Sequence, residues 1–369
     1  MIRVVHVITD TNLGGAGRML LTLLANRDRT KFATSVILPR GSVLEPEIKA
    51  LGCKVVQAEG IADQSLSITA VFELVRLLCG LRPDMIHTHA CMSARIAARL
   101  FLPRCKIVVT RHSVFDIPAY KKRFPYKTLS GLFNHSFSDR IIAVSPAAKE
   151  NVVDIGVCPE KVAVVFNGVD AAKRLSKQER LEIRKRYDIA ETDFVCAIIA
   201  RLEKVKGHEY IIEAFKGLPF NIKLVIAGEG SEEKKLHAAA RGHENIIFAG
   251  FVKSIHEIEN IMDVQLNASY GTEATSAALL EGMSLGIPAI VSDFGGNPYV
   301  IENDVNGLIV PKRDAMAMRT AIVELKGDTE RYNNMRKNGE RIFSERFTSR
   351  AMTAATELEY ILLMERKVT

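Results

Sequence analysis

Apolar, β-branched runs recur along the chain and alternate with segments whose apolar residues follow a helical period. The runs are IRVVHVI, ATSVILP, DMIHTHA, KIVVTRH, RIIAVS and KVAVVFN in the first half, and FVCAIIA, IKLVIAG, NIIFAGF, DVQLNAS, PAIVSDF and NGLIVPK in the second. Strands that alternate with helices are typical of parallel sheets with right-handed crossovers. The series restarts after a charged helical stretch at residues 176–190, so the pattern predicts an α/β fold with two doubly wound domains.

Length and cysteine usage agree with this division. A chain of 369 residues exceeds what one hydrophobic core usually supports. The six cysteines are scattered, with no C-x-x-C pair, so we expect reduced packing residues and neither disulfides nor structural zinc. The first residues start directly in a strand pattern without the layout of a signal peptide, and no apolar run has spanning length. We therefore expect a cytoplasmic protein.

The net charge of +7 is unevenly distributed. Residues 1–175 hold 24 Lys and Arg against 14 Asp and Glu, whereas the remainder holds 26 against 29. A basic half can meet an anionic membrane, an acidic glycan or nucleic acid. Because the sequence contains no nucleic-acid-binding motif, we expect no nucleic-acid partner and favour a membrane or an anionic acceptor.

The segment at residues 116–133, DIPAYKKRFPYKTLSGLF, concentrates that basic charge. Its cations stand among aromatic residues, a mixture that suits docking on an anionic bilayer. The alternative is an ordinary solvated helix, and both interpretations stay open. The candidate membrane or acceptor residues are Lys121, Lys122, Arg123 and Lys127.

Ligands of doubly wound sheets bind beyond the carboxyl ends of the strands, so the residues after each run carry the candidate chemistry. TDTNLGGAGRMLLTLL follows the first run, and Gly14, Gly15 and Gly17 open a helix whose free amides can bind an anion. The spacing is not G-x-G-x-x-G, and no acidic residue follows the second run to hold a ribose, which argues against a nicotinamide dehydrogenase. A purely structural glycine turn remains the alternative.

The second domain opens with IIARLEKVKGHEYIIEAF, in which Arg201 directly follows a strand and Lys206 precedes Gly207 and a helix. Two cations beside a helix start suit a diphosphate. The alternative is a pair of solvated loop charges. The chain contains no D-x-D pair, so we expect phosphates held by cations and amides, with no metal and no cofactor.

Two carboxylates stand eight positions apart in GTEATSAALLEGM, at Glu273 and Glu281. If the stretch were helical throughout, they would lie about 12 Å apart on one face. Alternatively, Glu273 lies on the loop before the helix and Glu281 inside it, with the intervening amides facing an anion. A carboxylate accepts hydrogen bonds from adjacent hydroxyls, which suits a ribose or a sugar. The plain alternative is two solvated surface residues.

Together these motifs resemble the GT-B fold retaining glycosyltransferases of family 4, glycosyl transferases group 1, over nearly the whole chain. The resemblance lies in the E-x7-E signature of Glu273 and Glu281, GMSLGIPAIVSDFGGNPYVI, NDVNGLIV, ARLEKVKG, GEGSEEKKL, FAGFV and FNGVD. It implies two Rossmann-like doubly wound domains facing a central cleft. Residues 1–172 would form the acceptor-side domain and residues 173–345 the nucleotide-sugar-binding domain, and a helix at 346–369 would pack back toward the first.

The resemblance also implies roles for individual residues. Arg201 and Lys206 would contact the donor diphosphate, and Glu281 would bind the ribose. Glu273 would bind the donor sugar together with three backbone amides, those of Ala274, Thr275 and Ser276. The other donor-binding residues implied are Gly250, Phe251 and Val252, which would border the base, and Gly15 and Gly17, which would approach the phosphates.

His112, after KIVVT, would face the donor sugar and the acceptor; the alternative is a polar loop residue. The chain departs from the family pattern at two places. Many members have Gly-Phe-Gly after the first glutamate, where this chain has residues 274–276, Ala-Thr-Ser. Many have a glutamate shortly after the paired glycines, where Arg18 stands here.

The function implied is a metal-independent retaining transfer from a nucleoside diphosphate sugar, with uridine diphosphate favoured, to a glycan or lipid-linked acceptor in cell-envelope polysaccharide synthesis. The enzyme would then act at the inner face of the cell membrane as a peripheral protein. Two alternatives stay open: a nucleotide-sugar 2-epimerase of the same fold, and a nonenzymatic sugar-nucleotide-binding protein.

Overall fold

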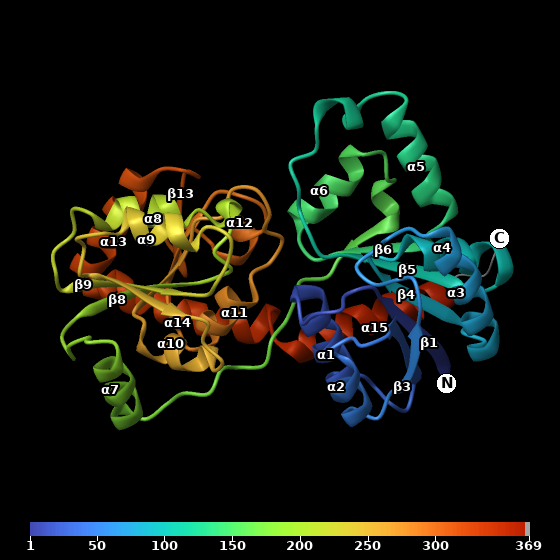
Figure 1. Cartoon of the computed structure of the whole chain (residues 1–369), viewed down its shortest axis with the longest axis horizontal. Helices are drawn as coiled ribbons and strands as arrows, with labels where there is room; N and C mark the ends of the chain where they lie inside the picture. The colour runs from blue at the N-terminus through green and yellow to red at the C-terminus, as the bar shows by residue number, and fades with distance from the viewer. Residues whose placement is uncertain (366–369) are drawn as a thin grey trace. The chain divides into compact units, whose positions relative to one another are not determined.

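The structure, a computed structural model that describes residues 1–365, divides the chain into two compact units, each with its own parallel sheet (Figure 1). The N-terminal unit contains Met1–Ser113, Ile117–Gly168 and the segment from Ser349 onward, and the C-terminal unit contains Val114–Asp116 and Val169–Thr348. Before the chain enters the C-terminal unit, the N-terminal unit thus ends at Gly168, four residues before the expected domain boundary at residue 172. Val169 pairs with Thr348 in an isolated bridge, and the Ala172 amide donates to Ser284 Oγ, which ties residues 169–172 to the second unit.

The N-terminal sheet has seven strands in the order β3-β2-β1-β4-β5-β6-β7, and all its neighbouring strands run parallel. The order reverses beside β1, so the ends of β1 and β4 form the switch point at which such sheets bind ligands. The strands are β1 (Ile2–Ile8), β2 (Phe32–Pro39), β3 (Lys54–Ala58), β4 (Met85–His89), β5 (Lys106–Arg111), β6 (Arg140–Ala143) and β7 (Val162–Val164).

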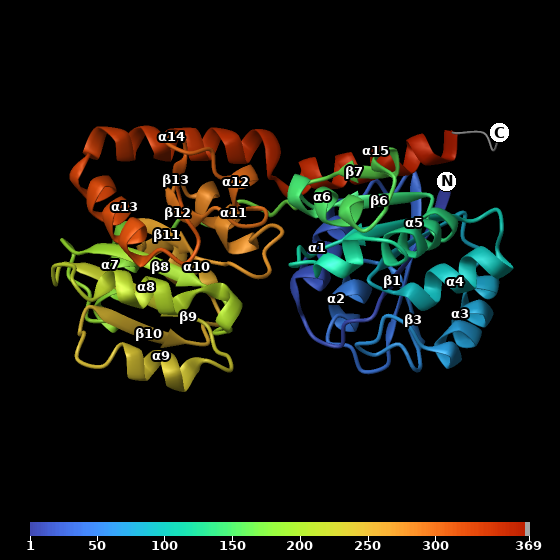
Figure 2. The same ribbon diagram turned by 90° about the horizontal axis from the view of Figure 1, so that it is seen from above.

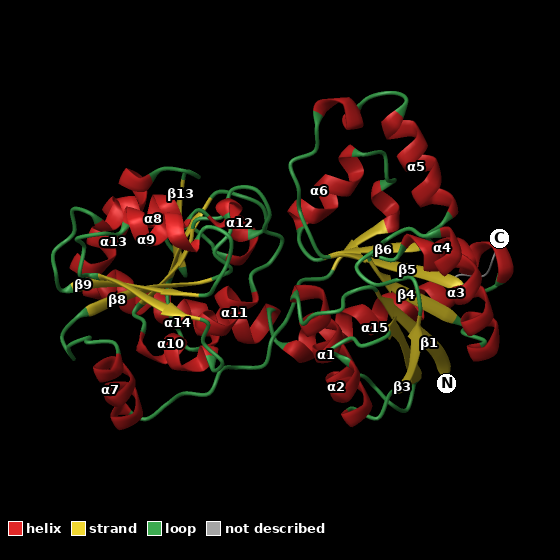
Figure 3. Cartoon of the chain, viewed as in Figure 1, coloured by secondary structure: helices red, strands yellow, loops and turns green. Residues whose placement is uncertain are grey.

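Helices cover both faces of this sheet, as the red and yellow layers of Figure 3 show. Odd-numbered β1 residues such as Val5 and Val7 pack with α3 and α4, whereas Ile8 packs with α1 and α2. The helices are α1 (Gly15–Asn26), α2 (Glu45–Ala50), α3 (Ile68–Leu81), α4 (Met92–Phe101), α5 (Tyr126–Ser136), α6 (Pro146–Asp154) and α15 (Ser349–Glu365), with 3-10 helices η1 (Ala119–Lys122) and η2 (Pro159–Lys161).

The last helix, α15, belongs to the N-terminal unit although nearly the whole second unit separates it in sequence. Figure 2 shows it lying against that unit. Glu357 Oε1 accepts from the Asp28 amide at 2.7 Å, and Arg140 Nε donates to Glu359 Oε2 at 2.5 Å. Buried Tyr360 meets Phe32 edge-on. The helix therefore completes the core of the first unit.

The C-terminal sheet has six parallel strands in the order β10-β9-β8-β11-β12-β13, and its order reverses between β8 and β11. Its strands are β8 (Phe194–Ile199), β9 (Ile222–Ala227), β10 (Ile246–Gly250), β11 (Val264–Asn267), β12 (Ala289–Ser292) and β13 (Gly307–Val310). Its helices are α7 (Lys177–Arg186), α8 (His208–Phe215), α9 (Glu233–Ala239), α10 (Ile255–Ile261), α11 (Ala277–Ser284), α12 (Asn297–Val300), α13 (Ala315–Gly327) and α14 (Thr329–Arg346), with η3 (Lys204–Lys206).

All twelve apolar runs coincide with strands, to within a residue or a few at their ends, and the charged stretch after the first series is α7, whose start is fixed by a capping box of Ser176 and Glu179. The two doubly wound domains are confirmed. The edge strand β3, KVVQA, is missing from the prediction because it is short and only Ala58 in it is buried. Four of the six cysteines are buried: Cys53, Cys91, Cys105 and Cys196.

Candidate functional site

Lys206 and Glu273 meet at the switch point of the C-terminal sheet. Lys206 lies in η3 after β8, and Glu273 lies in the loop after β11, the neighbouring strand. Lys206 Nζ lies 2.9 Å from Glu273 Oε2 and also donates to the carbonyl of Thr272 at 3.3 Å. The two side chains are only 16% and 9% exposed. The structure therefore brings the two predicted motifs together as a buried ion pair.

The Glu273 carboxylate has further donors around it. Oε2 also accepts from Ser269 Oγ at 3.2 Å and from Asn267 Nδ2 at 3.4 Å. Removing one partner of a buried pair leaves the other charge uncompensated, which typically costs about 3–5 kcal/mol. Neighbouring hydroxyl and amide donors reduce that cost for the carboxylate, because they satisfy it when the lysine moves to another anion. The site can thus release its lysine without leaving a bare carboxylate.

Two glycines allow the backbone segments around Glu273 to approach one another closely. Gly207 has φ 72°, and a Cβ there would lie 2.2 Å from the carbonyl oxygen of Ala268. A Cβ on Gly296 would lie 1.6 Å from the carbonyl oxygen of Ala274. The Gly296 amide donates to the Glu273 carbonyl at 3.0 Å. Only glycine fits at these contacts, which fix the loop carrying Glu273 against the neighbouring segments.

The second glutamate of the pair, Glu281, lies within α11, while Glu273 precedes that helix. This confirms the arrangement in which a loop glutamate and a helix glutamate flank a helix start. Ser276 caps the helix by accepting from the Leu279 amide at 3.4 Å. Glu281 Oε2 is buried and has no hydrogen-bond partner among residues 1–365. An unpaired buried carboxylate oxygen is costly, which favours a hydroxyl-bearing ligand at this position.

Arg201, Gly250, Phe251 and Val252 lie at or just after strand ends, and within residues 1–365 none of them forms a hydrogen bond or ion pair with Lys206 or Glu273. Arg201 is exposed and forms a 2.6 Å ion pair with Glu203. Gly250 ends β10 with φ 64°, and its carbonyl accepts from the Gly228 amide at 2.8 Å. Phe251 is 68% exposed, and Val252 packs against the core between α7 and α10.

His208, which the sequence analysis did not single out, lies directly after Gly207 at the start of α8. The residue is 2% exposed, and neither ring nitrogen has a partner in the described part of the chain. Burial, with a smaller effect from the Lys206 charge, lowers the pKa of His208 to about 4. Nothing in the local sequence distinguishes this histidine from a solvated one, since its burial depends on the packing of α8.

In the N-terminal unit, the predicted glycines stand at the start of α1, as expected. Gly14 is the N-cap residue and gives the helix no side-chain cap. Gly15 has open space around the position of a Cβ, whereas a Cβ on Gly17 would lie 3.0 Å from Leu44 Cδ2. Gly17 therefore serves the packing of α1 on Leu44, and Gly15 is the glycine of the two whose surroundings leave room for a ligand.

His112 follows β5 and joins a cluster of histidines that the sequence analysis missed. Its Nε2 lies 2.9 Å from His89 Nδ1, and His89 Nε2 lies 3.2 Å from His6 Nδ1. His87, next to them on β4, contacts Tyr360 Oη at 2.5 Å through Nδ1 and Thr110 Oγ1 at 2.6 Å through Nε2. The signal in the sequence was the H-x-H of DMIHTHA, because a strand turns such residues to the same face.

Burial is the main cause of the lowered pKa values in this histidine cluster. It lowers the pKa of His6 to about 3, with a smaller effect from Arg27, and that of His112 to about 4, with a smaller effect from Arg111. The pKa values of His87 and His89 also lie well below the usual range, because of burial and then the neighbouring rings. The imidazoles are therefore neutral at neutral pH.

The cluster also includes a set of possible metal ligands. His6, His87 and His89 each offer one nitrogen, and these nitrogens lie within 4.8 Å of one another. Zinc–nitrogen bonds of about 2.1 Å would require nitrogens about 3.4 Å apart. Both nitrogens of His87 are already hydrogen-bonded, so a metal would have to displace Tyr360 or Thr110. The contacts present fit a hydrogen-bonded cluster better than a metal site.

The basic and aromatic segment forms η1 and α5, and no residue of either helix is buried. Phe124 between them is 84% exposed. Lys122 pairs with Asp154 at 2.5 Å, and all four predicted cations, Lys121, Lys122, Arg123 and Lys127, are exposed. Among the helices of residues 1–365, none is both long and apolar enough to cross a membrane.

Comparisons with known proteins match both units. The family model for glycosyl transferases group 1 matches residues 179–342, and that for glycosyltransferase family 4 matches residues 13–173. The chain is 26% identical to N-acetyl-alpha-D-glucosaminyl L-malate synthase of Bacillus anthracis over 290 residues, which cover 75% of this chain and 74% of that protein. It is 27% identical to UDP-Gal:alpha-D-GlcNAc-diphosphoundecaprenol alpha-1,3-galactosyltransferase of Escherichia coli over 284 residues, 73% of each chain.

Among solved structures, the fold is similar to that of Alr3699/HepE of Anabaena in complex with UDP. The TM-score is 0.85 at 20% sequence identity, and the match covers 98% of this chain and 100% of the other. Together with the two sheets described above, this confirms the expected fold class, GT-B with two Rossmann-like domains.

Proposed function

The chain belongs to the glycosyltransferases that these two family models describe, and from that premise we propose that it transfers a sugar from a uridine diphosphate sugar to a glycan or lipid-linked acceptor. The setting proposed is cell-envelope polysaccharide biosynthesis. The Escherichia coli relative is named for a UDP-galactose donor and a diphosphoundecaprenol-linked acceptor, and the Anabaena structure contains UDP. These names support the donor and acceptor classes proposed here.

The buried pair of Lys206 and Glu273 is the observation that carries this proposal. A lysine held at a sheet switch point by a carboxylate with other donors is ready to move to a diphosphate. Arg201, whose present partner is an exposed carboxylate, can add a second positive charge because an exposed pair is weak. Glu281, with its unpaired buried oxygen, would then accept from the ribose hydroxyls.

The chemistry proposed is transfer with retention of anomeric configuration and without a metal ion. The bond between the anomeric carbon and the donor phosphate oxygen breaks, and the acceptor oxygen bonds to the same face of the sugar. The departing phosphate accepts the proton of the acceptor hydroxyl, so no protein base is required. Lys206 and Arg201 stabilise the charge that develops on the diphosphate, while Glu273 and the amides of residues 274–276 orient the sugar. His112 would contact the sugar or the acceptor.

Thermal-shift titration with a panel of nucleotides and nucleotide sugars tests the donor site. We expect UDP and one UDP-sugar to raise the melting temperature, and we expect Lys206→Ala and Glu281→Ala to abolish the shift. Lys204→Ala is the matched control, since Lys204 is an exposed lysine two positions away. The same panel is then followed for release of UDP in the presence and absence of EDTA, and the anomeric configuration of the product is read by NMR.

Each outcome separates the competing functions. Selective stabilisation followed by UDP release with an acceptor supports the transferase. Conversion of the sugar without an acceptor would identify an epimerase, and binding without any turnover would identify a nonenzymatic protein. If no nucleotide stabilised the protein, the donor site built from these residues would be wrong.

We also propose that the segment of η1 and α5 docks on an anionic membrane, where a lipid-linked acceptor would lie. Exposed aromatic and aliphatic side chains lie there among cations, and no helix residue is buried. The double variant Phe124→Ser, Leu129→Ser should lose binding to vesicles containing phosphatidylglycerol. Phe220→Ser, an exposed phenylalanine of the other unit, is the control. Equal binding by both variants would overturn the docking proposal.

A further inference from the structure

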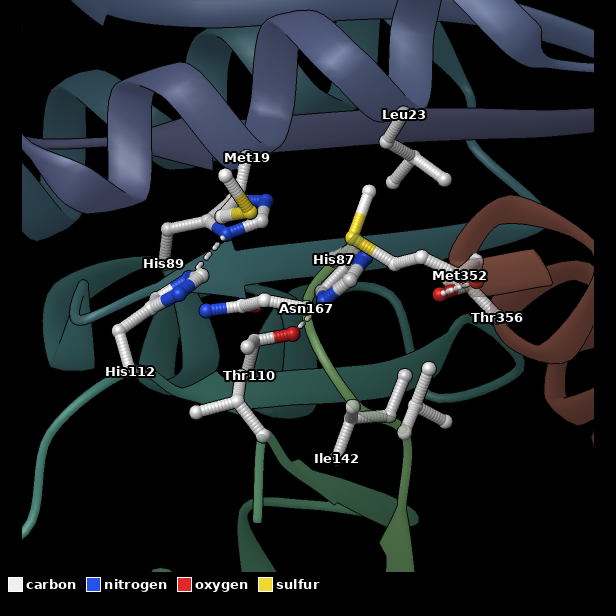
Figure 4. A pocket seen from close by; sticks show the side chains of 12 residues that line it. Met19, Leu23, His87, His89, Thr110, His112, Ile142, Asn167, Met352 and Thr356 are labelled. Atoms are coloured by element: carbon white, nitrogen blue, oxygen red, sulfur yellow. Dashed lines mark hydrogen bonds between the residues drawn. The ribbon is translucent and has the colours of Figure 1, made fainter. Parts of the chain in front are cut away.

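Three imidazole rings form a hydrogen-bonded row behind the carboxyl ends of β1, β4 and β5. His6 Nδ1 contacts His89 Nε2 at 3.2 Å, and His89 Nδ1 contacts His112 Nε2 at 2.9 Å. In both pairs the ring planes are nearly parallel, at 18° and 26°, with centroids 5.5 and 5.2 Å apart. Figure 4 shows the rings of His89 and His112 meeting edge to edge beneath α1. The row connects the core of the N-terminal unit to the residue that follows β5.

The register of the sheet produces this row. His6 on β1 and His87 on β4 are Cα partners, and His89 is two residues beyond His87. Because side chains alternate between the faces of a strand, all three point to the face that α1 and α15 cover. His89 is the partner of Thr110 on β5, and His112 follows two residues later. Three strands that are distant in sequence therefore bring their histidines into contact.

A neutral imidazole carries one proton on its two ring nitrogens, which constrains the row. If His89 donates from Nδ1 to His112, its Nε2 must accept from His6, and then all three rings carry their proton on Nδ1. If His89 instead donates from Nε2 to His6, its Nδ1 must accept from His112, and all three carry it on Nε2. Either way the three rings share one tautomer. The His6 and His89 rings are almost fully buried, so water does not satisfy a ring that departs from the pattern.

The far nitrogen of His112, Nδ1, is the end of the row. It is buried and has no hydrogen-bond partner among residues 1–365. His112 also helps to line a cavity of about 30 Å³, whose polar side is formed by His87, His89, Thr110, His112 and Asn167 (Figure 4). A cavity of this size and polarity accommodates one water molecule. The tautomer that the row shares determines whether Nδ1 of His112 is a hydrogen-bond donor or an acceptor.

We propose that His6 and His89 are positioning residues that hold the ring of His112 and determine which of its nitrogens carries the proton. This inference rests on the proposed role of His112 in glycosyl transfer. His6 touches neither His112 nor, on the function proposed, any substrate; it acts through His89. A histidine whose tautomer is fixed presents one defined hydrogen-bonding group, whereas an unsupported ring would divide between two.

Ring-nitrogen NMR of the full chain with ¹⁵N-labelled histidine tests the inference without an activity assay. The protein has nine histidines, and single His→Asn variants assign the three signals. In the wild type we expect the protonated fraction of Nδ1 to be the same in His6, His89 and His112. Different fractions in the three rings would overturn the proposal, whatever the enzyme does.

The second arm uses His6→Phe, which keeps a ring but removes its nitrogens. We expect the tautomer fraction of His112 to change, and kcat for UDP release to fall by up to about a hundredfold while the KM for the donor stays constant. His6→Asn, whose side-chain nitrogen takes the place of Nδ1, should restore much of both. His87→Phe is the matched control: it removes a buried ring on the same sheet face, but one that bonds Tyr360 and Thr110 instead of the row.

The controls separate this inference from the proposed function. An unchanged His112 tautomer in His6→Phe, or the same change in His87→Phe, would overturn the positioning role. If the three rings did not share a tautomer but the donor still bound, the positioning role would be wrong and the proposed donor site would be unaffected. Conversely, a shared tautomer in a protein that binds no nucleotide sugar would support the row and refute the transferase.

Discussion

The two sheets place different chemistry at the same topological position. At the switch point of the C-terminal sheet, Lys206 and Glu273 form an ion pair whose neighbours can also satisfy the carboxylate. Beside the switch point of the N-terminal sheet, the polar groups are imidazoles whose buried surroundings keep them neutral. On the function proposed, the first region would exchange its cation with an anionic ligand, whereas the second would supply hydrogen bonds without charge.

This contrast shows that topology sets where the polar groups lie but not what they are. In each sheet the strand order reverses beside the strand that comes first in the sequence of that unit, β1 or β8. In the C-terminal unit glycines bring charged loops together above the strand ends, while in the N-terminal unit the histidines lie within the strands β1 and β4 and just after β5. A change in pH should therefore affect mainly the histidines of the N-terminal unit. A substitution that removes a charge should affect mainly the Lys206–Glu273 pair of the C-terminal unit.

Lowering the pH should make the largest difference between the two units. Each buried histidine takes up a proton on unfolding, because its pKa is lowered in the folded state. The free energy of unfolding is therefore not reduced by these histidines above pH 6.5, and it decreases as the pH falls toward the pKa that each histidine has in the folded protein. Between pH 6.5 and 5 a histidine whose folded pKa is about 3, such as His6, lowers the free energy of unfolding by about 2 kcal/mol, and the lowered pKa values of His87 and His89 act in the same direction. This window lies above the usual titration range of carboxylates.

Hydrogen exchange measured by mass spectrometry at pH 7 and pH 5 checks this expectation for each unit separately. Peptides of β1, β4 and β5 should lose protection first, because the C-terminal unit has one comparable histidine, His208. Equal loss of protection in both units would contradict it.

Lys206→Ala should have the next largest effect. It leaves the Glu273 carboxylate without its cation, at a cost of about 3 kcal/mol or somewhat less because Ser269 and Asn267 remain as donors. Loss of one charge-stabilising group should lower kcat about 10²–10³-fold. Urea denaturation and UDP release measure the two effects. The double variant Lys206→Ala, Glu273→Gln should regain stability but not activity; no recovery of stability would show that the pair is not the cause.

Gly296→Ala should destabilise the C-terminal unit by about 1–3 kcal/mol, because the added methyl group would overlap the carbonyl of Ala274. The loop carrying Glu273 would have to move. Gly327→Ala, at an exposed helix end where nothing lies within 4 Å of the new carbon, is the control and should be neutral or slightly stabilising. Similar melting temperatures for the two variants would mean that the loop is not held as described.

Tyr360→Phe should cost about 1 kcal/mol in the N-terminal unit, since it removes the hydroxyl that bonds His87 Nδ1. The change tests whether the last helix is tied to the histidine cluster. Leu362→Ala, on an exposed part of the same helix, is a suitable control. An unchanged stability in Tyr360→Phe would place the hydroxyl outside the network.

The smallest effect on stability should come from Arg201→Ala. The Arg201–Glu203 pair is exposed, and such pairs are worth less than about 1 kcal/mol. Donor binding should nevertheless weaken, because the proposal uses Arg201 as a cation for the diphosphate. A thermal-shift titration with UDP separates the two: an unchanged melting temperature without ligand and a smaller shift with it are expected. A full shift would remove Arg201 from the site.

The order of strands and helices could be predicted from the sequence because it depends on local patterns. Runs such as IKLVIAG and PAIVSDF are apolar and bounded by turn residues, and each became a strand. The placement of Glu273 before a helix and Glu281 within it was one of two alternatives, and the Ser276 cap decides between them. The edge strand β3 was missed because its residues are mostly exposed.

Contacts between distant strands could not be predicted in the same way. His6 and His89 are 83 residues apart, and Tyr360 lies 273 residues from His87. Nothing local distinguishes these residues, or the buried His208, from polar residues that face solvent. The family resemblance implied that Lys206 and Glu273 act on the same donor, but the contact between the two side chains, 67 residues apart, was not predicted.

The sequence by itself determined the two parallel sheets, the division between them, and the loops in which charged residues stand, because hydrophobic periodicity and glycine positions are local properties of the chain. Only the tertiary structure decided which side chains touch. Strand order and register bring three histidines into one row. The packing of α15 places the end of the chain in the first unit. Burial there removes the charge of the histidines, because a neutral imidazole costs less to bury than a charged one.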